Sequence, residues 1–260
     1  MTLEEAIAKI KPLDHNAMEI AQKRWDSIAK PLHSLGKLET LLIQIAGITG
    51  NAEVDLSRRG LIAMCADNGV VEEGVTQTGQ EVTAIVAENF LKYDTALGVM
   101  CKQNHAEIFP VDMGMVTDTK VRTDHKIAYG TQNMTKGPAM TREQAVKGLE
   151  AGIDMVRELN DKGYRILATG EMGIGNTTTS SAVASVLLKQ PVEEMTGRGA
   201  GLTSEGLVRK INAIKKAIAL NKPDPEDAID VLAKVGGLDI AGMAGVFLGG
   251  AVYGIPVVMD

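Results

Sequence analysis

The sequence contains few aromatic residues, few cysteines and no cluster of positive charge. Aromatic residues make up 3% of its 260 positions, and 27 basic residues stand against 33 acidic ones, for a net charge of −6. Because binding a polyanion requires a clustered positive face, the sequence argues against a nucleic-acid partner.

Cysteine occurs only at Cys65 and Cys101, far apart and among apolar or small neighbours. This pattern predicts two buried thiols in a reducing compartment rather than a disulfide. The four histidines show no metal-ligand spacing with each other or with the cysteines, so we expect no metal site. We also expect no cofactor. The Gly-x-Ser-x-Gly turn of a serine nucleophile is also missing.

An uninterrupted hydrophobic run of membrane-spanning length is absent too. The longest candidate, residues 241–260, is broken by glycines and by Pro256, and it predicts a buried helix followed by a strand. The first twenty residues mix acidic and apolar side chains, unlike a signal or transit peptide. We therefore expect a cytoplasmic protein with no membrane partner.

The apolar residues follow two different periodicities along the chain. Residues 1–56 show only helical spacing and predict a small helical module. Residues 57–260 alternate between continuous apolar strands and amphipathic helices, and they predict an α/β domain. The expected fold is a mostly parallel, Rossmann-like sheet with helices on both faces. The expected strands are 59–69, 106–114, 164–170 and 255–260.

Ligands of such sheets bind beyond the carboxyl ends of the strands, and a glycine-rich turn follows the third strand there. Its sequence, GEMGIGNTTTSS, begins at Gly170 and leads into a helix of small residues. Glycines let the backbone approach an anion, and a helix N-terminus presents N–H groups to it. The alternative is a turn with a threonine cap and no ligand. The candidate anion-binding residues are Gly173, Gly175, Asn176, Thr177 and Thr178.

A second glycine cluster, GRGAGL at residues 197–202, precedes another helix. Gly199 and Gly201 lie in it, and Lys210 follows as a nearby cation. Two such turns can clamp one phosphate from two sides, which favours a phosphorylated small molecule as ligand. The alternative is a flexible loop beside a solvated lysine.

Several carboxylates stand at the predicted strand ends. Glu171 lies inside the first glycine-rich turn, where it would face the ribose hydroxyls of a ligand or accept a proton rather than contact a phosphate. The alternative for Glu171 is an exposed turn residue. Asp67, Asp112 and Asp260 each end a strand, and each either caps a turn or lines the same site.

Taken together, the motifs KPLHSLGKLE, MCADNGVVEEGVTQTGQEVTAIVAENFL, GEMGIGNTT, GRGAGL and GGLDIAGMAG resemble those of one family. It is the nicotinate-nucleotide:dimethylbenzimidazole phosphoribosyltransferase family of cobamide synthesis, and the resemblance covers nearly the whole chain. The resemblance implies transfer of the phosphoribosyl group of nicotinate mononucleotide to 5,6-dimethylbenzimidazole or a related base. The products would be α-ribazole 5′-phosphate and nicotinate.

The same resemblance assigns roles to particular residues. It implies that Gly199, Gly201 and Lys210 complete the phosphate site and that Glu171 lies near the ribose and the reacting centre. The residues implied to hold the nucleotide are Gly173, Gly175, Asn176, Thr177 and Thr178. The resemblance also implies a homodimer. The residues implied to border the base are Gln77, Glu81 and Ile85.

Three features differ from the family pattern. Asn68 stands where histidine is usual. Ile85 stands where some members use glutamine, and this second difference could alter the choice of base toward other benzimidazoles, purines or phenols. The sequence ends at Asp260, whereas family members continue to a glutamate taken to be the catalytic base. We therefore expect a C-terminally incomplete α/β domain.

A missing catalytic glutamate leaves a second function open. The chain would then be a non-catalytic or partner-dependent nucleotide-binding subunit. A dinucleotide-binding dehydrogenase is disfavoured, because the glycine pattern falls late in the chain and lacks the acidic residue that should follow it.

Overall fold

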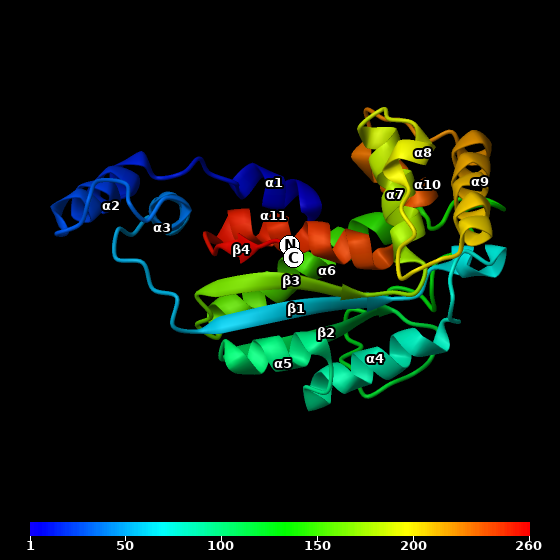
Figure 1. Ribbon diagram of the computed structural model, residues 1–260, viewed down its shortest axis with the longest axis horizontal. Coiled ribbons are helices and arrows are strands. Elements are labelled where there is room, and N and C mark those ends of the chain that lie inside the picture. The colour runs from blue at the N-terminus through cyan, green and yellow to red at the C-terminus, as the bar shows by residue number, and fades with distance from the viewer.

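The computed structural model describes all residues from 1 to 260. The fold is built on a parallel sheet (Figure 1). Its four strands lie in the order β2-β1-β3-β4. In the central strand β1 every residue except the first is buried, as expected for a strand covered on both faces. The strands are β1 (Arg59–Ala66), β2 (Ala106–Gly114), β3 (Ile166–Met172) and β4 (Val257–Val258).

Helices cover the two faces of this sheet. On one face lie α1, α6 and α11, and on the other lie α4 and α5 (Figure 1). The main apolar core is formed by the first of these layers and the sheet, and it includes Ile62, Val111, Ile153 and Leu238. The bounds are α1 (Leu3–Lys9), α4 (Glu81–Lys92), α5 (Ala96–Gln103), α6 (Arg142–Asp161) and α11 (Leu238–Tyr253).

Glycines allow α11 to lie unusually close to its neighbours. A Cβ atom on Gly152 of α6 would lie 2.7 Å from the backbone carbon of Gly245, so the two helix backbones touch. A Cβ atom on Gly242 would lie 2.9 Å from Cγ of Met64 in β1. This close packing fixes the N-terminal end of α11 against the carboxyl end of the sheet.

A second apolar core lies at the carboxyl ends of the strands, where four further α-helices and a 3₁₀ helix gather (Figure 1). It includes Val70, Ala182, Ile214 and Val231. These helices stand over the edge of the sheet at which ligands of parallel sheets bind. The elements are η1 (Gly69–Glu73), α7 (Asn176–Leu187), α8 (Val192–Met195), α9 (Ser204–Asn221) and α10 (Ala228–Val235).

The remaining helices, α2 (His15–Ser27) and α3 (Lys37–Thr49), pair with each other at the amino ends of the strands (Figure 1). A Cβ atom on Gly47 of α3 would lie 2.7 Å from Sδ of Met18, so this pair is also tightly packed. By contrast, Leu3 and Ala6 of α1 belong to the main core of the α/β domain. The division of the chain at residue 56 stays a prediction.

The predicted α/β fold is confirmed, with its parallel sheet and helices on both faces. The run at residues 241–260 forms a helix and a short strand, as expected, although the strand β4 has only two residues. Cys65 and Cys101 are buried free thiols. No helix of the structure is both long enough and apolar enough to span a membrane.

Candidate active site

The candidate site lies where β1 and β3 end and where α7 and α11 begin. Asn68 follows β1, Glu171 is the penultimate residue of β3, and Asp239 lies in the first turn of α11. Asn68 and Asp239 are fully buried and joined by a hydrogen bond of 3.3 Å from Nδ2 to Oδ2. The parallel topology therefore brings together polar groups that are far apart in the sequence.

The turn from Gly173 to Gly175 forms one wall of this site. Gly175 adopts a left-handed conformation with φ of 94°, which glycine tolerates best, and it starts helix α7 without a capping side chain. The backbone N–H of Ile174 donates to Oγ1 of Thr83 on α4 at 3.1 Å, which anchors the turn. An N-terminus without a capping side chain is a suitable environment for an anion.

Lys210 of α9 points into the same region and is only 1% exposed. Its Nζ donates to Oγ1 of Thr177 at 2.8 Å and to the carbonyl of Gly197 at 3.2 Å. No carboxylate pairs with it, and burial lowers the pKa of its ammonium group. A buried lysine that lacks a counter-ion is costly unless an anionic ligand supplies one.

The second glycine-rich loop lies against the first. A Cβ atom on Gly199 would lie 2.7 Å from Oγ1 of Thr177, so only glycine permits this approach. Gly199 and Gly201 both have left-handed backbones, with φ of 57° and 101°. The side-chain amide of Gln77 donates to the carbonyl of Gly201, which ties this loop to the segment before α4. The structure thus places the two loops side by side.

Glu171 extends from β3 beside the start of α7. The side-chain amide of Asn176 donates to its Oε2 and lowers its pKa. Partial burial of the carboxyl group outweighs this bond, and together with the negative charge of Asp260 it raises the pKa of Glu171 above its ordinary value. Glu171 remains solvent-exposed, so a ligand can reach it.

The three residues expected at the base lie at the start of α4 and just before it. Gln77, Glu81 and Ile85 are all exposed, and Ile85 follows Glu81 by one helical turn on the same face. Thr83, on the buried face of this helix, holds the glycine turn described above. The contact of the first three with a base stays a prediction.

Two of the three strand-end aspartates, Asp67 and Asp112, bind turns. Asp67 accepts a hydrogen bond of 2.8 Å from the backbone of Val116, and its burial raises its pKa. Asp112 accepts one of 2.7 Å from Met115 and lies 3.1 Å from Nζ of Lys126. These contacts give both residues a structural role.

Comparison with known proteins decides the family. Residues 10–260 match the family model described as phosphoribosyltransferase. The chain belongs to this phosphoribosyltransferase family. A nicotinate-nucleotide–dimethylbenzimidazole phosphoribosyltransferase of Ruminiclostridium cellulolyticum is 53% identical over 262 residues, which span 100% of this chain and 74% of the relative. The enzyme of the same name from Clostridium acetobutylicum is 52% identical, with the same shares covered.

A solved structure agrees with these sequence relatives. The crystal structure of CobT from Thermus thermophilus superposes with a TM-score of 0.87 at 36% identity. The superposition covers 94% of this chain and 74% of that one. The phosphoribosyltransferase fold is therefore shared across nearly the whole chain.

Sequence reasoning did not single out Asp239 in this phosphoribosyltransferase. Its carboxylate accepts the backbone N–H of Ile240 at 2.9 Å and the amide of Asn68. Burial, reinforced by the charge of Glu171, raises the pKa of Asp239 to about 7. The signal was present in the sequence, since Asp239 is the second residue of an otherwise apolar helix that follows Gly236 and Gly237.

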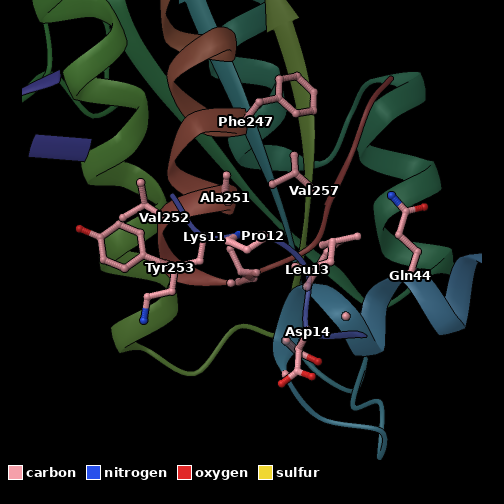
Figure 2. A pocket seen from close by; sticks show the side chains of 17 residues that line it. Lys11, Pro12, Leu13, Asp14, Gln44, Phe247, Ala251, Val252, Tyr253 and Val257 are labelled. Atoms are coloured by element: carbon pink, nitrogen blue, oxygen red, sulfur yellow. The ribbon is translucent and has the colours of Figure 1, made fainter. Parts of the chain in front are cut away.

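A cavity of about 790 Å³ lies at the other end of the molecule (Figure 2). It is bordered by Lys11, Leu13 and Asp14 before and at the start of α2, by Gln44 of α3, and by Tyr253 at the C-terminal end of α11. Because α11 runs the length of the sheet, this cavity is separated from Asp239 at the start of the helix (Figure 1). It contributes nothing to the candidate site.

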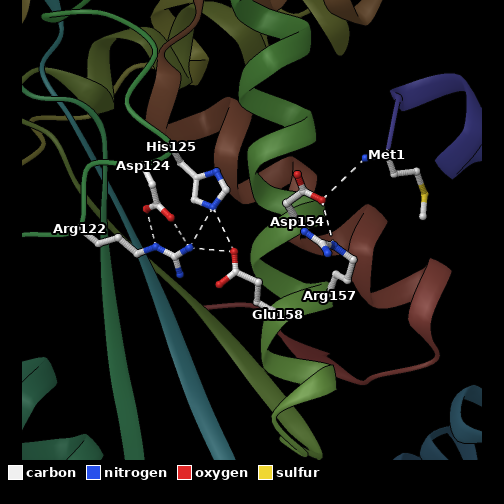
Figure 3. A network of polar contacts seen from close by, with 7 residues as sticks. All are labelled: Met1, Arg122, Asp124, His125, Asp154, Arg157 and Glu158. Carbon is white, nitrogen blue, oxygen red and sulfur yellow. Dashed lines mark hydrogen bonds and ion pairs between the residues drawn. The ribbon is translucent and has the colours of Figure 1, made fainter.

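A charged cluster on the loop after β2 and on α6 has the spacing of a metal site. Potential ligand atoms of Asp124, His125 and Glu158 lie within 4.8 Å of one another (Figure 3). The guanidinium group of Arg122, however, donates to both carboxylates, at 2.8 Å in the case of Glu158. The arginine thus supplies the positive charge, and the cluster is an ion-pair network.

Proposed function

We propose that this phosphoribosyltransferase transfers the phosphoribosyl group of nicotinate mononucleotide to 5,6-dimethylbenzimidazole or a related base. The products are α-ribazole 5′-phosphate and nicotinate. The observation that carries the proposal is Lys210, a buried cation that joins the two glycine-rich loops and lacks a carboxylate partner. The relatives at about half identity bear the name of this reaction.

The phosphate of the nucleotide would lie between the two loops. Lys210 offers its remaining N–H bond and its positive charge, and the start of α7 offers backbone N–H groups. Thr177 contacts Lys210 and is exposed, so its hydroxyl can bind a phosphate oxygen. The net charge of −6 makes such local donors necessary, because the protein as a whole repels an anion.

The chemistry requires one carboxylate near the anomeric carbon. A ring nitrogen of the base forms a bond to C1′ of the ribose while the bond from C1′ to the pyridinium nitrogen breaks. The electron pair of the broken bond neutralises the pyridinium, and nicotinate leaves. The proton on the attacking imidazole ring must then be removed, and Glu171, with its raised pKa, is suited to accept it.

The acceptor base would bind beside α4. Ile85 offers an exposed apolar surface of the kind that a flat aromatic ring can contact, with Gln77 and Glu81 as polar neighbours. Since Thr83 fixes α4 to the turn that precedes α7, the base and the nucleotide would be held in a fixed position relative to each other.

The reaction is tested by incubating the purified chain with nicotinate mononucleotide and 5,6-dimethylbenzimidazole. We expect α-ribazole 5′-phosphate and nicotinate in equal amounts by liquid chromatography and mass spectrometry. Reactions without the base control for simple hydrolysis of the nucleotide. Binding of the nucleotide without any ribotide at prolonged incubation would contradict the proposal.

We also propose that the chain is cytoplasmic and forms a homodimer, with residues 1–56 as a small helical module. Large apolar side chains on this module are exposed, which supports contact with a second copy. They include Ile28, Leu32, Leu35, Leu38 and Leu41. Light scattering during size-exclusion chromatography should give twice the chain mass of 27.6 kDa. The buried free thiols of Cys65 and Cys101 support a reducing compartment.

A further inference from the structure

We propose that Asn68 is a positioning residue for this reaction. It holds the start of α7, on the nucleotide side of the site, in a fixed position relative to the start of α4, on the base side. The inference rests on the proposed function, because that function requires the two substrates to meet. Asn68 itself is 0% exposed and therefore touches no substrate. Its effect on the reaction would pass through the helices that it contacts.

The side chain of Asn68 joins two helix starts. Its Nδ2 donates to Oδ2 of Asp239 in the first turn of α11 at 3.3 Å. Its Oδ1 accepts from the hydroxyl of Thr179 in α7 at 3.4 Å, and the same hydroxyl bonds the carbonyl of Asn176 at 3.0 Å. An ionised carboxylate can only accept hydrogen bonds, so the amide must present its nitrogen to Asp239 and its oxygen to Thr179. The orientation of Asn68 is thus determined.

The backbone of Asn68 contacts the other side of the site. Its carbonyl oxygen accepts from Nε2 of Gln80 at 3.3 Å and from the backbone N–H of Val71 at 3.1 Å. Gln80 directly precedes α4, the helix that carries Glu81 and Ile85. One residue just after β1 therefore binds α7 through its side chain and the start of α4 through its main chain.

Glycines leave room for Asn68 against the turn after β3. A Cβ atom on Gly173 would lie 3.1 Å from Nδ2 of Asn68, and one on Gly175 would lie 3.4 Å from its Cβ. A Cβ atom on Gly237, before α11, would lie 2.6 Å from its Oδ1. The side chain is thus packed against the turn that leads into α7, and a change in its position displaces that turn.

The contacts of Asn68 are separate from those that would bind either substrate. The phosphate site keeps the bond between Lys210 and Thr177, and the side chains expected at the base keep their own helix. Loss of the Asn68 amide should therefore shift the two halves relative to each other, while each half stays able to bind. A misplacement of about 1 Å can lower the rate about 100-fold.

The variant Asn68→Ala tests this separation. We expect kcat for ribotide formation to fall about 10-fold or more, while the Kd of each substrate changes less than about threefold. The matched control is Asn221→Ala, which removes a partly buried amide at the C-terminal end of α9 and should leave all three values unchanged. Affinities that fall in step with kcat, or an unchanged kcat, would overturn the proposal.

Substitutions of Thr179 test the contact without changing Asn68. Thr179→Val keeps the shape of the side chain and removes the hydroxyl, so kcat should fall about threefold to 10-fold. Thr179→Ser keeps the hydroxyl, and its kcat should stay within about twofold of the wild type. In the Asn68→Ala background, Thr179→Val should lower kcat by less than about twofold, because its acceptor has already been removed. Equal losses in both backgrounds would overturn the proposal.

A measurement without turnover keeps this proposal distinct from the proposed function. In the protein without substrate, Asn68→Ala should speed hydrogen–deuterium exchange at least about threefold in residues 80–86 and 173–181, relative to the wild type. Exchange in α5 should stay as it is, and Asn221→Ala should change none of these segments. Exchange that is unaltered in Asn68→Ala, or that rises equally in α5, would overturn the positioning role even if ribotide is formed.

Discussion

Lys210 donates a hydrogen bond of 2.8 Å to Oγ1 of Thr177, joining helix α9 to the first turn of α7. The two residues come from different glycine-rich segments of the sequence. Their contact converts two separate candidate anion sites into one, with a buried ammonium group at its centre.

Replacing Lys210 should separate ligand binding from stability. Lys210→Ala is expected to weaken binding of nicotinate mononucleotide by roughly 10-fold to 100-fold, the scale of one charge-assisted contact, as measured by calorimetry. Lys210→Met fills the same space without charge, and it should bind the nucleotide as weakly as Lys210→Ala does. It should unfold at a higher temperature than the wild type, because a buried unpaired cation destabilises the fold.

The control for this pair lies on the same helix. Lys215 pairs with Glu193 at the surface, and Lys215→Ala should leave nucleotide affinity unchanged. Equal affinity of wild type and Lys210→Ala would remove the lysine from the phosphate site.

The rate should depend on pH through Glu171. Since its folded pKa is raised above the ordinary glutamate value of 4.5, the carboxylate loses its ability to accept a proton as pH falls through that raised value. We expect kcat to decline on the acid side with an apparent pKa above 4.5. Glu171→Gln should have a low kcat at every pH. If kcat of this variant declined at low pH as it does in the wild type, another group would be the proton acceptor.

A methyl group on Gly173 should disrupt the site. Its carbon would lie 2.5 Å from the carbonyl oxygen of Ala66 and would collide with Asp239, neither of which has room to move. Gly173→Ala is expected to lower nucleotide affinity at least about 10-fold, since a displaced turn loses its contacts with the phosphate. Gly137→Ala, where the added carbon meets nothing within 4 Å, should bind as the wild type does.

Ile85 should influence the choice of base. Its side chain is 56% exposed, so Ile85→Gln is not expected to change the unfolding temperature. A new hydrogen-bonding group should alter the ratio of rates with 5,6-dimethylbenzimidazole and adenine by roughly 3-fold to 10-fold, in competition assays read by mass spectrometry. Leu91→Gln, on the same helix and 47% exposed, serves as control. An unchanged ratio would place the base elsewhere.

Asp239 should make stability depend on pH. Its folded pKa of about 7 exceeds the ordinary value of 3.8, so between these values the folded state binds more protons than the unfolded state, and stability falls as pH rises. Asp239→Asn removes this dependence. The unfolding temperature of the variant relative to wild type should therefore increase from pH 5 to pH 8, and a constant difference would contradict the assigned pKa.

The order of helices and strands was predictable because apolar periodicity is a local property. The strand at 106–114 was predicted with the bounds that the structure has. Side chains buried on both faces leave a continuous apolar run, which the sequence displays directly. The 3₁₀ turn at 69–73 and the short helix at 192–195 were missed, because so few residues show no periodicity.

The residues of the candidate site were also visible in part. Glycine clusters before helices mark a turn that can hold an anion, and they pointed to Gly175, Gly199 and Lys210. Whether Lys210 was buried or solvated could not be read from its neighbours. Nor could the sequence show that Gln77 reaches the carbonyl of Gly201, since these residues are 124 positions apart.

The sequence by itself determined the parallel α/β fold and the two glycine-rich turns, because both arise from short-range patterns. Only the tertiary structure decided which polar groups meet. Asp239 reaches Asn68 and the turn at Gly173 because close helix packing at Gly152 and Gly242 holds α11 against the sheet. Such contacts form only when segments far apart in the sequence pack closely, and the pattern of neighbouring residues does not show which segments do so.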